Sequence, residues 1–425
     1  VQSRRVLAAY DRPKRFDTNV VVIGAGSAGL VAALIAATVK AKVTLIERHR
    51  MGGDCLNTGC VPSKSLIRSA SVARTARRAE EFGLAPMPVE VNFPKVMERV
   101  QGVIRTIEPH DSVERFTGLG VDCVQGDARI ISPWEVEVNG QRIAARNIII
   151  ASGARPRVPD VEGLQDIDYL TSDTVWDIRE QPRRLLVLGA GPIGCELAQA
   201  FAGLGSEVTL VTRNQRIMPA EDEAVSTFMQ GVLERDGIAV CAGLSAQRFG
   251  QDDAGQYGVF TAQEGEQTLQ FDRLLVAVGR QANVEGMGLE ALGITLDDAG
   301  RIKVDDYLAT SVPTIAACGD VAGPYLFTHM ASHQAWYAAV NALFGRFRRF
   351  RVDYSVVPWA TFTDPEVAHV GLNELAAARD GIAYEVTRYE LEGHDRALAE
   401  GEAHGFVKVL TRPGSDRILG ATIVG

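Results

Sequence analysis

The chain has 425 residues, a length that predicts two to four domains, each with its own apolar interior. Hydrophobic residues make up 46% and charged residues 23%, an ordinary globular composition that argues against a disordered protein. The net charge of −9 argues against a general affinity for nucleic acid. No apolar run approaches the roughly 18 residues that are needed to span a bilayer. The six cysteines mostly lack paired spacing, which favours a reducing, cytoplasmic setting.

Residues 1–17 are rich in basic side chains, and we interpret them as a solvated leader or linker. They also suit a domain cut from a longer protein that is tethered to the cytoplasmic side of a membrane. The chain starts at Val1 and stops on the strand-like run 417–425, so both ends look cut. The basic residues of this leader are Arg4, Arg5, Arg12, Lys14 and Arg15.

A βαβ unit follows the leader. The β-branched run 19–23 predicts a strand, and the glycine-rich turn formed by Gly24, Gly26 and Gly29 opens a helix of small residues through Ala41. Residues 43–46 predict the second strand, and Glu47 follows at its end. A carboxylate in this place can accept hydrogen bonds from a ribose hydroxyl, although a surface charge is the alternative interpretation.

The same pattern recurs from Leu185, 165 positions later. A strand leads to a second turn, formed by Gly189, Gly191 and Gly194, then to a helix that ends at about Gly205 and a strand over 208–211. In each turn the first glycine makes the bend, the second lets the backbone approach a pyrophosphate, and the third lets helix and strand pack closely. Two such units predict two dinucleotide sites.

The second unit differs where the first has its carboxylate. Thr212 takes the place of Glu47, and Arg213 and Arg216 follow it. Arginine can donate charge-assisted hydrogen bonds to a 2′-phosphate, so the sequence favours NADPH over NADH, without excluding NADH. Exposed arginines at a strand end are the alternative.

Two cysteines lie five positions apart, at Cys55 and Cys60. On a regular helix they would face different sides, so a disulfide requires a distorted segment, for which Gly59 and Pro62 supply the means. The remaining cysteines are single and lie in apolar settings, which argues against zinc. His329 and His333 have helical spacing, but we expect structural or flavin-side roles and no metal.

A short run of arginine and phenylalanine, GRFRRFR, occupies residues 345–351. It could contact RNA or an anionic surface, but we interpret it as a solvated linker and expect no nucleic-acid partner.

The segment GGDCLNTGCVPSK around the two cysteines closely resembles the active-site segment of the class I pyridine nucleotide-disulfide oxidoreductases, which include dihydrolipoamide dehydrogenase, glutathione reductase and mercuric reductase. Residues 148–156 and 277–283 resemble the two crossovers between the family's domains. Residues 314–323 resemble its third flavin motif, and 357–371 resemble the entry to its interface domain. The resemblance covers residues 18–425.

This resemblance implies an α/β fold with two Rossmann-like three-layer domains, one for FAD and one for NAD(P), plus a truncated α+β interface domain. We place the FAD-binding domain at 18–156, the NAD(P)-binding domain at 157–282, the second part of the FAD domain at 283–350 and the interface domain at 351–425. A homodimer is implied for the full-length protein.

The resemblance also divides the work among the site residues. Cys60 lies against the flavin and forms the charge-transfer thiolate, whereas Cys55 exchanges with substrate. Lys64 lies near the flavin and pairs with Glu196. Glu47, the six glycines of the two turns and the arginine pair are assigned to cofactor binding. Seven further residues share this assignment: Gly53, Ala128, Ser152, Gly153, Gly279, Arg280 and Asp320. By the resemblance, Asp320 hydrogen-bonds the ribityl chain of FAD.

The function implied is transfer of electrons from NAD(P)H through FAD to the Cys55–Cys60 disulfide, and on to a small-molecule disulfide or a metal ion. The family's acid–base histidine lies near the C-terminus, and the chain ends before such a segment; His394 and His404 cannot simply replace it. Two alternatives remain: a redox or thiol-sensing module of a larger protein without free-substrate turnover, and an NAD(P)H oxidase that uses flavin alone.

Overall fold

The computed structural model describes residues 7–263 and 265–425. The chain divides into two compact units: the first comprises residues up to 61, 102–155 and 280–354, and the second comprises 62–101, 156–279 and 355–425. The division falls inside three elements, α4 (Cys60–Arg77), α5 (Phe93–Ile107) and β7 (Ala154–Pro156). No helix in the described part of the chain is long and apolar enough to cross a membrane.

A seven-stranded sheet forms the centre of the first unit. Its parallel part has the order β3, β2, β1, β6 and β17, and β6 continues into an antiparallel meander with β5 and β4. The strands are β1 (Thr18–Ile23), β2 (Val43–Glu47), β3 (Val121–Gln125), β4 (Arg129–Ser132), β5 (Glu135–Val138), β6 (Gln141–Ile150) and β17 (Ile315–Ala317). β16 (Arg280–Ala282) pairs with β7 beside them.

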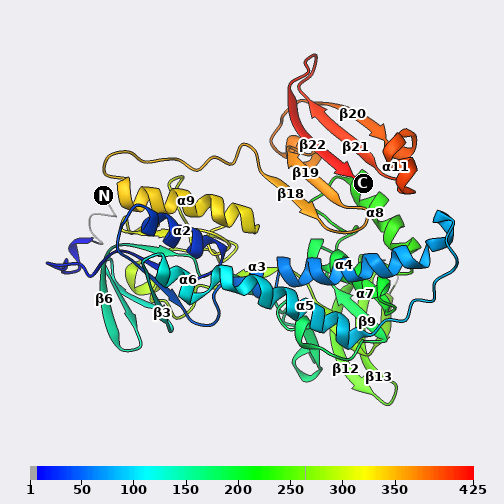
Figure 1. Ribbon diagram of the computed structural model, residues 1–425, viewed down its shortest axis with the longest axis horizontal. Coiled ribbons are helices and arrows are strands. Elements are labelled where there is room, and N and C mark those ends of the chain that lie inside the picture. The colour runs from blue at the N-terminus through cyan, green and yellow to red at the C-terminus, as the bar shows by residue number, and fades with distance from the viewer. Residues whose placement is uncertain (1–6, 264) are drawn as a thin grey trace. The chain divides into compact units, whose positions relative to one another are not determined.

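The two faces of this sheet pack against different parts of the first unit because successive strand residues point to opposite sides. Val20 and Val22 belong to the core under α2 (Ser27–Thr38) and α9 (Thr328–Phe344), whereas Val21 and Ile23 belong to the core on the other face. Figure 1 shows α2 and α9 side by side over the sheet. The other helices of this unit are α3 (Gly53–Asn57) and α6 (Val113–Gly118).

A five-stranded parallel sheet with the order β11, β10, β9, β15 and β8 forms the first half of the second unit. An antiparallel sheet of β12, β13 and β14 packs on it through Phe249, Phe260 and Phe271. The elements are β8 (Tyr169–Thr171), β9 (Arg184–Leu188), α7 (Pro192–Gly203), β10 (Glu207–Thr212), α8 (Glu223–Arg235), β11 (Ala239–Ala242), β12 (Ser245–Asp252), β13 (Gly255–Ala262), β14 (Gly265–Phe271) and β15 (Arg273–Val276).

The rest of the second unit is an antiparallel sheet with the order β18, β19, β22, β21 and β20. Its buried Lys408 forms ion pairs with Asp222 and with Glu374, at 2.7 Å from the latter, which satisfies the charge in the interior. The elements are β18 (Pro358–Thr361), β19 (Val367–Gly371), α10 (Glu374–Arg379), β20 (Glu385–Glu390), α11 (Asp395–Glu400), β21 (Phe406–Thr411) and β22 (Ile418–Val424).

The α/β architecture predicted from the sequence is confirmed, because each predicted βαβ unit is present and each opens a parallel sheet. The predicted domain limits stay a prediction, and the compact units divide the chain differently. Residues 62–101 belong to the second unit, where Phe93 packs on Phe201 and the methyl group of Ala70 lies against Gly203.

Candidate active site

The first glycine turn is shaped to leave room for a bound group. Gly24 has a φ of +100°, in the left-handed region that favours glycine, and a Cβ there would strike the carbonyl of Ala151. A Cβ on Gly29 would collide with the carbonyl oxygen of Gly24. Gly26 and Gly53 approach so closely that a side chain on Gly53 would overlap the Gly26 backbone. The amino end of α2 therefore stays open, as a pyrophosphate requires.

Glu47 lies at the end of β2, as the sequence predicted, and its carboxylate is fixed beside this turn. It accepts hydrogen bonds from the backbone N–H of Ala25 at 2.7 Å and of His49 at 2.8 Å. A carboxylate has about four acceptor positions, so capacity remains for ribose hydroxyls. The residues present thus fit the adenosine half of FAD.

Asp320 supplies a second carboxyl group in the first unit. Burial raises its pKa to about 6, and the nearby Arg280 guanidinium opposes this rise. The Nε atom of Arg280 lies 3.7 Å from Asp320 Oδ2, and the same guanidinium forms an ion pair with Asp54. Arg280 therefore links the residue before Cys55 to the carboxyl group that the sequence assigned to the ribityl chain.

The remaining residues assigned to FAD by resemblance also belong to the first unit. Ser152 donates a hydrogen bond to the carbonyl of Asn283 at 2.8 Å, and the Asn283 amide donates back to the Ser152 carbonyl at 2.9 Å. Gly153 has a φ of +67°. Ala128 is half-buried and packs against the apolar core.

The cysteine segment is distorted in the predicted way. Helix α3 ends at Asn57, and α4 begins at Cys60, so the break between them falls on Thr58 and Gly59. The Gly59 N–H bonds back to the carbonyl of Asp54, and a Cβ on Gly59 would lie 2.9 Å from that oxygen. This break allows the two cysteine side chains to meet across five positions.

The two sulfur atoms form one polar cluster in the first unit. The Cys55 thiol is hydrogen-bonded with Cys60, and this bond, together with burial, raises the pKa of Cys55 above its usual value. Cys60 Sγ lies 3.2 Å from the hydroxyl oxygen of Thr328, at the start of α9. Thr328 and Asp54 were missed from the sequence, because only the fold brings α9 and Arg280 to the cysteine loop.

The second glycine turn repeats the geometry of the first. Gly189 has a φ of +110°, and a Cβ on it would strike the carbonyl of Ala277. A Cβ on Gly194 would collide with the carbonyl oxygen of Gly189, whereas Gly191 meets no atom within 4 Å. Gly279, assigned from the sequence to cofactor binding, has a φ of +119°. The amino end of α7 is thus open in the same way as that of α2.

The end of β10 carries positive charge in place of the Glu47 carboxylate. Thr212 is buried, and its hydroxyl accepts a hydrogen bond from the Asn214 N–H at 3.3 Å. Arg213 is exposed and Arg216 is half-buried. Within residues 7–263 and 265–425 neither arginine forms an ion pair with a carboxylate.

Lys64 and Glu196 form the pair that the resemblance implied, within the second unit. Lys64 Nζ lies 3.0 Å from Glu196 Oε2, and the other carboxylate oxygen accepts the backbone N–H of Phe362 at 2.9 Å. The Phe362 ring lies under the ammonium, 4.2 Å from Nζ to the ring centroid, a favourable cation–π geometry. Phe362 is a further residue that sequence reasoning missed, since it contacts Lys64 from 298 positions away.

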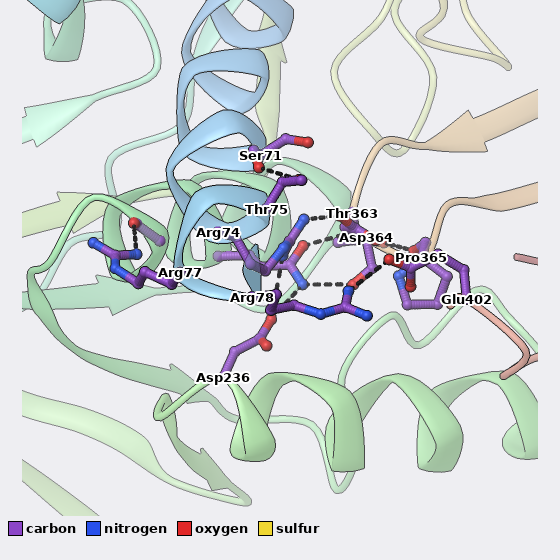
Figure 2. A network of polar contacts seen from close by, with 12 residues as sticks. Ser71, Arg74, Thr75, Arg77, Arg78, Asp236, Thr363, Asp364, Pro365 and Glu402 are labelled. Carbon is purple, nitrogen blue, oxygen red and sulfur yellow. Dashed lines mark hydrogen bonds and ion pairs between the residues drawn. The ribbon is translucent and has the colours of Figure 1, made fainter. Parts of the chain in front are cut away.

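The far end of α4 is held by a second polar network, drawn in Figure 2. Arg74 forms an ion pair with Asp364 and lies 3.6 Å from Asp236, and Arg78 Nη1 lies 2.6 Å from Glu402. A cavity of about 440 Å³ lies between α4, residues 362–366 and Gly425, with Lys64 and His404 among its lining residues. These contacts fix the axis of the helix that carries Lys64.

No group of three or more His, Cys, Asp or Glu side chains in the described residues is arranged to hold a metal ion. His333 Nε2 lies 2.9 Å from the carbonyl oxygen of Asp353, and His329 stacks on Phe327. His394 accepts the Ala397 N–H at the start of α11, and His404 lies 3.4 Å from Glu402.

Burial raises the pKa of Cys123, Cys195, Cys241 and Cys318.

Comparison with known proteins agrees with this geometry. The family model described as pyridine nucleotide-disulphide oxidoreductase matches residues 18–341, and the dimerisation domain of the same family matches residues 357–425. The chain belongs to this family. As an oxidoreductase of this family it is an FAD-dependent enzyme that uses NAD(P)H and a redox-active disulfide.

Several characterised members of the family are similar over most of their length. A mercuric reductase of Staphylococcus aureus is 33% identical to this chain, over 96% of this chain and 74% of the reductase. A dihydrolipoyl dehydrogenase of Chlamydia muridarum is 36% identical, over 96% of this chain and 87% of the dehydrogenase. LpdA from Mycobacterium tuberculosis superposes with a TM-score of 0.86 at 26% identity, covering 96% of this chain and 90% of LpdA. The flavoprotein disulfide reductase RclA from Escherichia coli superposes with a TM-score of 0.84 at 25% identity, covering 96% of this chain and 90% of RclA.

Proposed function

We propose that electrons pass from a nicotinamide held at the second glycine turn, through FAD held in the first unit, to the Cys55–Cys60 disulfide, and then to a small-molecule disulfide or a metal ion. The observation that carries this proposal is the contact between the two thiols across the break between α3 and α4, in a segment whose Gly53 lies against Gly26 of the first glycine turn. The names of the similar mercuric reductase and dihydrolipoyl dehydrogenase support the two classes of acceptor.

The cysteines have different roles in this proposal. Bound FAD would supply the two-electron relay between the nicotinamide hydride and the disulfide. The Cys55 thiolate attacks one sulfur of an acceptor disulfide and expels one thiolate; Cys60 then attacks the mixed disulfide, releases the second thiolate and restores the Cys55–Cys60 bond. Because the pKa of Cys55 is raised, a base must take its proton before this attack, and we expect turnover to increase with pH.

By the family resemblance, Lys64 would supply a positive charge that favours the anionic form of a reduced flavin. Glu196 and the Phe362 ring hold its ammonium from two sides, and the Phe362 N–H orients the carboxylate. Arg280 and Asp54 position the loop before Cys55, and Asp320 would hydrogen-bond the ribityl chain of bound FAD.

The dimerisation domain supports a homodimer as the active assembly. We also propose that the protein works in the cytoplasm, where thiols are kept reduced, and that any anchor in the cytoplasmic face of a membrane lies outside this chain. NADPH is the preferred nicotinamide because Arg213 and Arg216 have no carboxylate partner in the described residues.

Anaerobic titration of the FAD-loaded protein with NADPH tests the proposal. We expect the reduced protein to show the long-wavelength absorbance of a thiolate beside an oxidised flavin, and Cys60→Ser to abolish it. Cys55→Ser should keep this absorbance but lose the reduction of lipoamide, glutathione disulfide or Hg(II). Absence of the band in the intact protein would refute the disulfide route and leave the flavin-only oxidase. A normal band with no turnover of any acceptor would favour the redox module without free substrate.

A further inference from the structure

An open cavity of about 590 Å³ lies in the first unit, on the chain just before β1. Four of its six lining residues are cations, and none is acidic. The lining residues are Arg12, Pro13, Lys14, Arg15, Phe16 and Arg146. Such a concentration of one charge is unexpected in a protein whose net charge is −9.

The fold, rather than the sequence alone, assembles this basic cavity. The Asp17 N–H donates to the carbonyl of Ala144 at 2.9 Å, and the Ala144 N–H donates back to the Asp17 carboxylate at 2.8 Å. This pair fixes residues 12–16 beside Arg146 on β6. The Arg12 and Arg146 guanidinium groups both approach the ring of Phe16, at 5.6 and 5.1 Å from its centroid. The Asp17 carboxylate accepts this N–H through one oxygen, and within the described residues it forms no ion pair with the cations of the cavity.

No carboxylate of the described residues forms an ion pair with any of these four cations. The other basic run of the first unit is different: Arg349 pairs with Asp305 at 3.4 Å, and Arg351 pairs with Asp306 at 2.7 Å. Like charges held together repel one another, and an anion that enters the cavity relieves this repulsion.

We propose that this cavity binds the phosphate groups of an anionic ligand. Guanidinium groups match phosphate oxygens in pairs, and the cavity has the size of a small-molecule site. The site is separate from the FAD site of the proposed function, since it adjoins the amino end of β1, whereas the Gly24 turn follows its other end, about 20 Å away for a six-residue strand. The ligand is either a free polyphosphate-bearing molecule or the headgroup of an anionic phospholipid.

Two probes distinguish these sources with the FAD-loaded full chain. Calorimetric titration with inorganic tripolyphosphate at low ionic strength measures free phosphate binding. Flotation with vesicles of phosphatidylcholine, with and without phosphatidylglycerol, measures headgroup binding. The test variant replaces Arg12, Lys14, Arg15 and Arg146 by alanine, and the matched control replaces Arg346, Arg348, Arg349 and Arg351, so both lose the same charge from exposed positions of the first unit.

We expect the test variant to weaken binding about fivefold for each cation removed, more than a hundredfold in all, while the control stays within about threefold of the unmodified chain. Tripolyphosphate binding without vesicle binding identifies a soluble ligand, and vesicle binding that requires phosphatidylglycerol identifies a headgroup; either outcome supports the site. The proposal is overturned if neither probe binds the unmodified chain, or if the test and control variants lose affinity equally. FAD content and thermal midpoint show whether the variants fold. If the variant with four substitutions does not fold, the single Arg146→Ala variant takes its place.

Discussion

The two βαβ units of this chain have the same backbone but opposite charges at the matching strand end. In each, the third glycine lies against the carbonyl of the first, and the first lies against the carbonyl of the residue that follows a neighbouring strand, Ala151 after β6 and Ala277 after β15. The first unit then presents the Glu47 carboxylate, held by two backbone N–H groups, whereas the second presents Arg213 and Arg216 without carboxylate partners in the described residues. In the proposed function the backbone of each turn would hold a dinucleotide, and the side chain at the strand end would select which one.

The largest effect is expected from the third glycine of each unit. A valine at Gly194 would collide with the Gly189 carbonyl and displace α7, so Gly194→Val should keep FAD but slow flavin reduction by NADPH by on the order of a hundredfold. Gly29→Val should instead lose the flavin itself. FAD absorbance per chain and anaerobic stopped-flow reduction measure the two effects.

A control for these variants is Gly118→Ala, because a Cβ on Gly118 meets no atom within 4 Å. It should change neither quantity. Dithionite, which needs no nicotinamide site, should still reduce the flavin of Gly194→Val at the normal rate. If Gly194→Val lost FAD as Gly29→Val does, the two turns would not serve separate cofactors.

The next effect concerns the pH dependence of stability. The folded-state pKa of Asp320 is raised to about 6, so its contribution to the free energy of unfolding is present below its usual value of 3.8 and is lost as the pH rises through about 6. Asp320→Asn removes this loss, which amounts to at most about 3 kcal/mol. The thermal midpoint of the flavin-free protein between pH 4 and 7 measures it.

Asp272 in the second unit provides a comparison of opposite sign. Its hydrogen bonds with Arg184 lower its pKa, so its contribution is present at neutral pH and is lost as the pH falls through the lowered value. Asp272→Asn should therefore reduce the thermal midpoint at pH 7 and have little effect in strong acid. Equal pH profiles for the two variants would contradict the assigned signs.

The smallest effect tests the strand-end charge directly. Arg213→Ala should lower kcat/KM for NADPH about ten- to a hundredfold, because each charge-assisted bond to a 2′-phosphate contributes about 1.5 to 3 kcal/mol, and should leave NADH nearly unchanged. Arg235→Ala, an exposed arginine at the end of α8, is the matched control and should change neither. Equal losses with both nicotinamides after Arg213→Ala would refute the assignment.

Local sequence determined much of this protein. Both βαβ units, their glycine turns, the position of Glu47 and the break at Gly59 were predictable, because each depends on residues that are neighbours in the chain or on the steric freedom of glycine. The pairing of Lys64 with Glu196 was predictable only through resemblance to a family, since 132 positions separate the two residues.

Tertiary structure alone decided the partners of these residues. Thr328 beside Cys60, Phe362 under Lys64, and Asp54 paired with Arg280 come from segments without any local pattern that indicates the contact. The same holds for Arg146, which completes the basic cavity from the middle of a strand. Spacing along the chain specifies local backbone geometry, but contacts between distant segments depend on sheet order and packing, which side-chain periodicity does not encode.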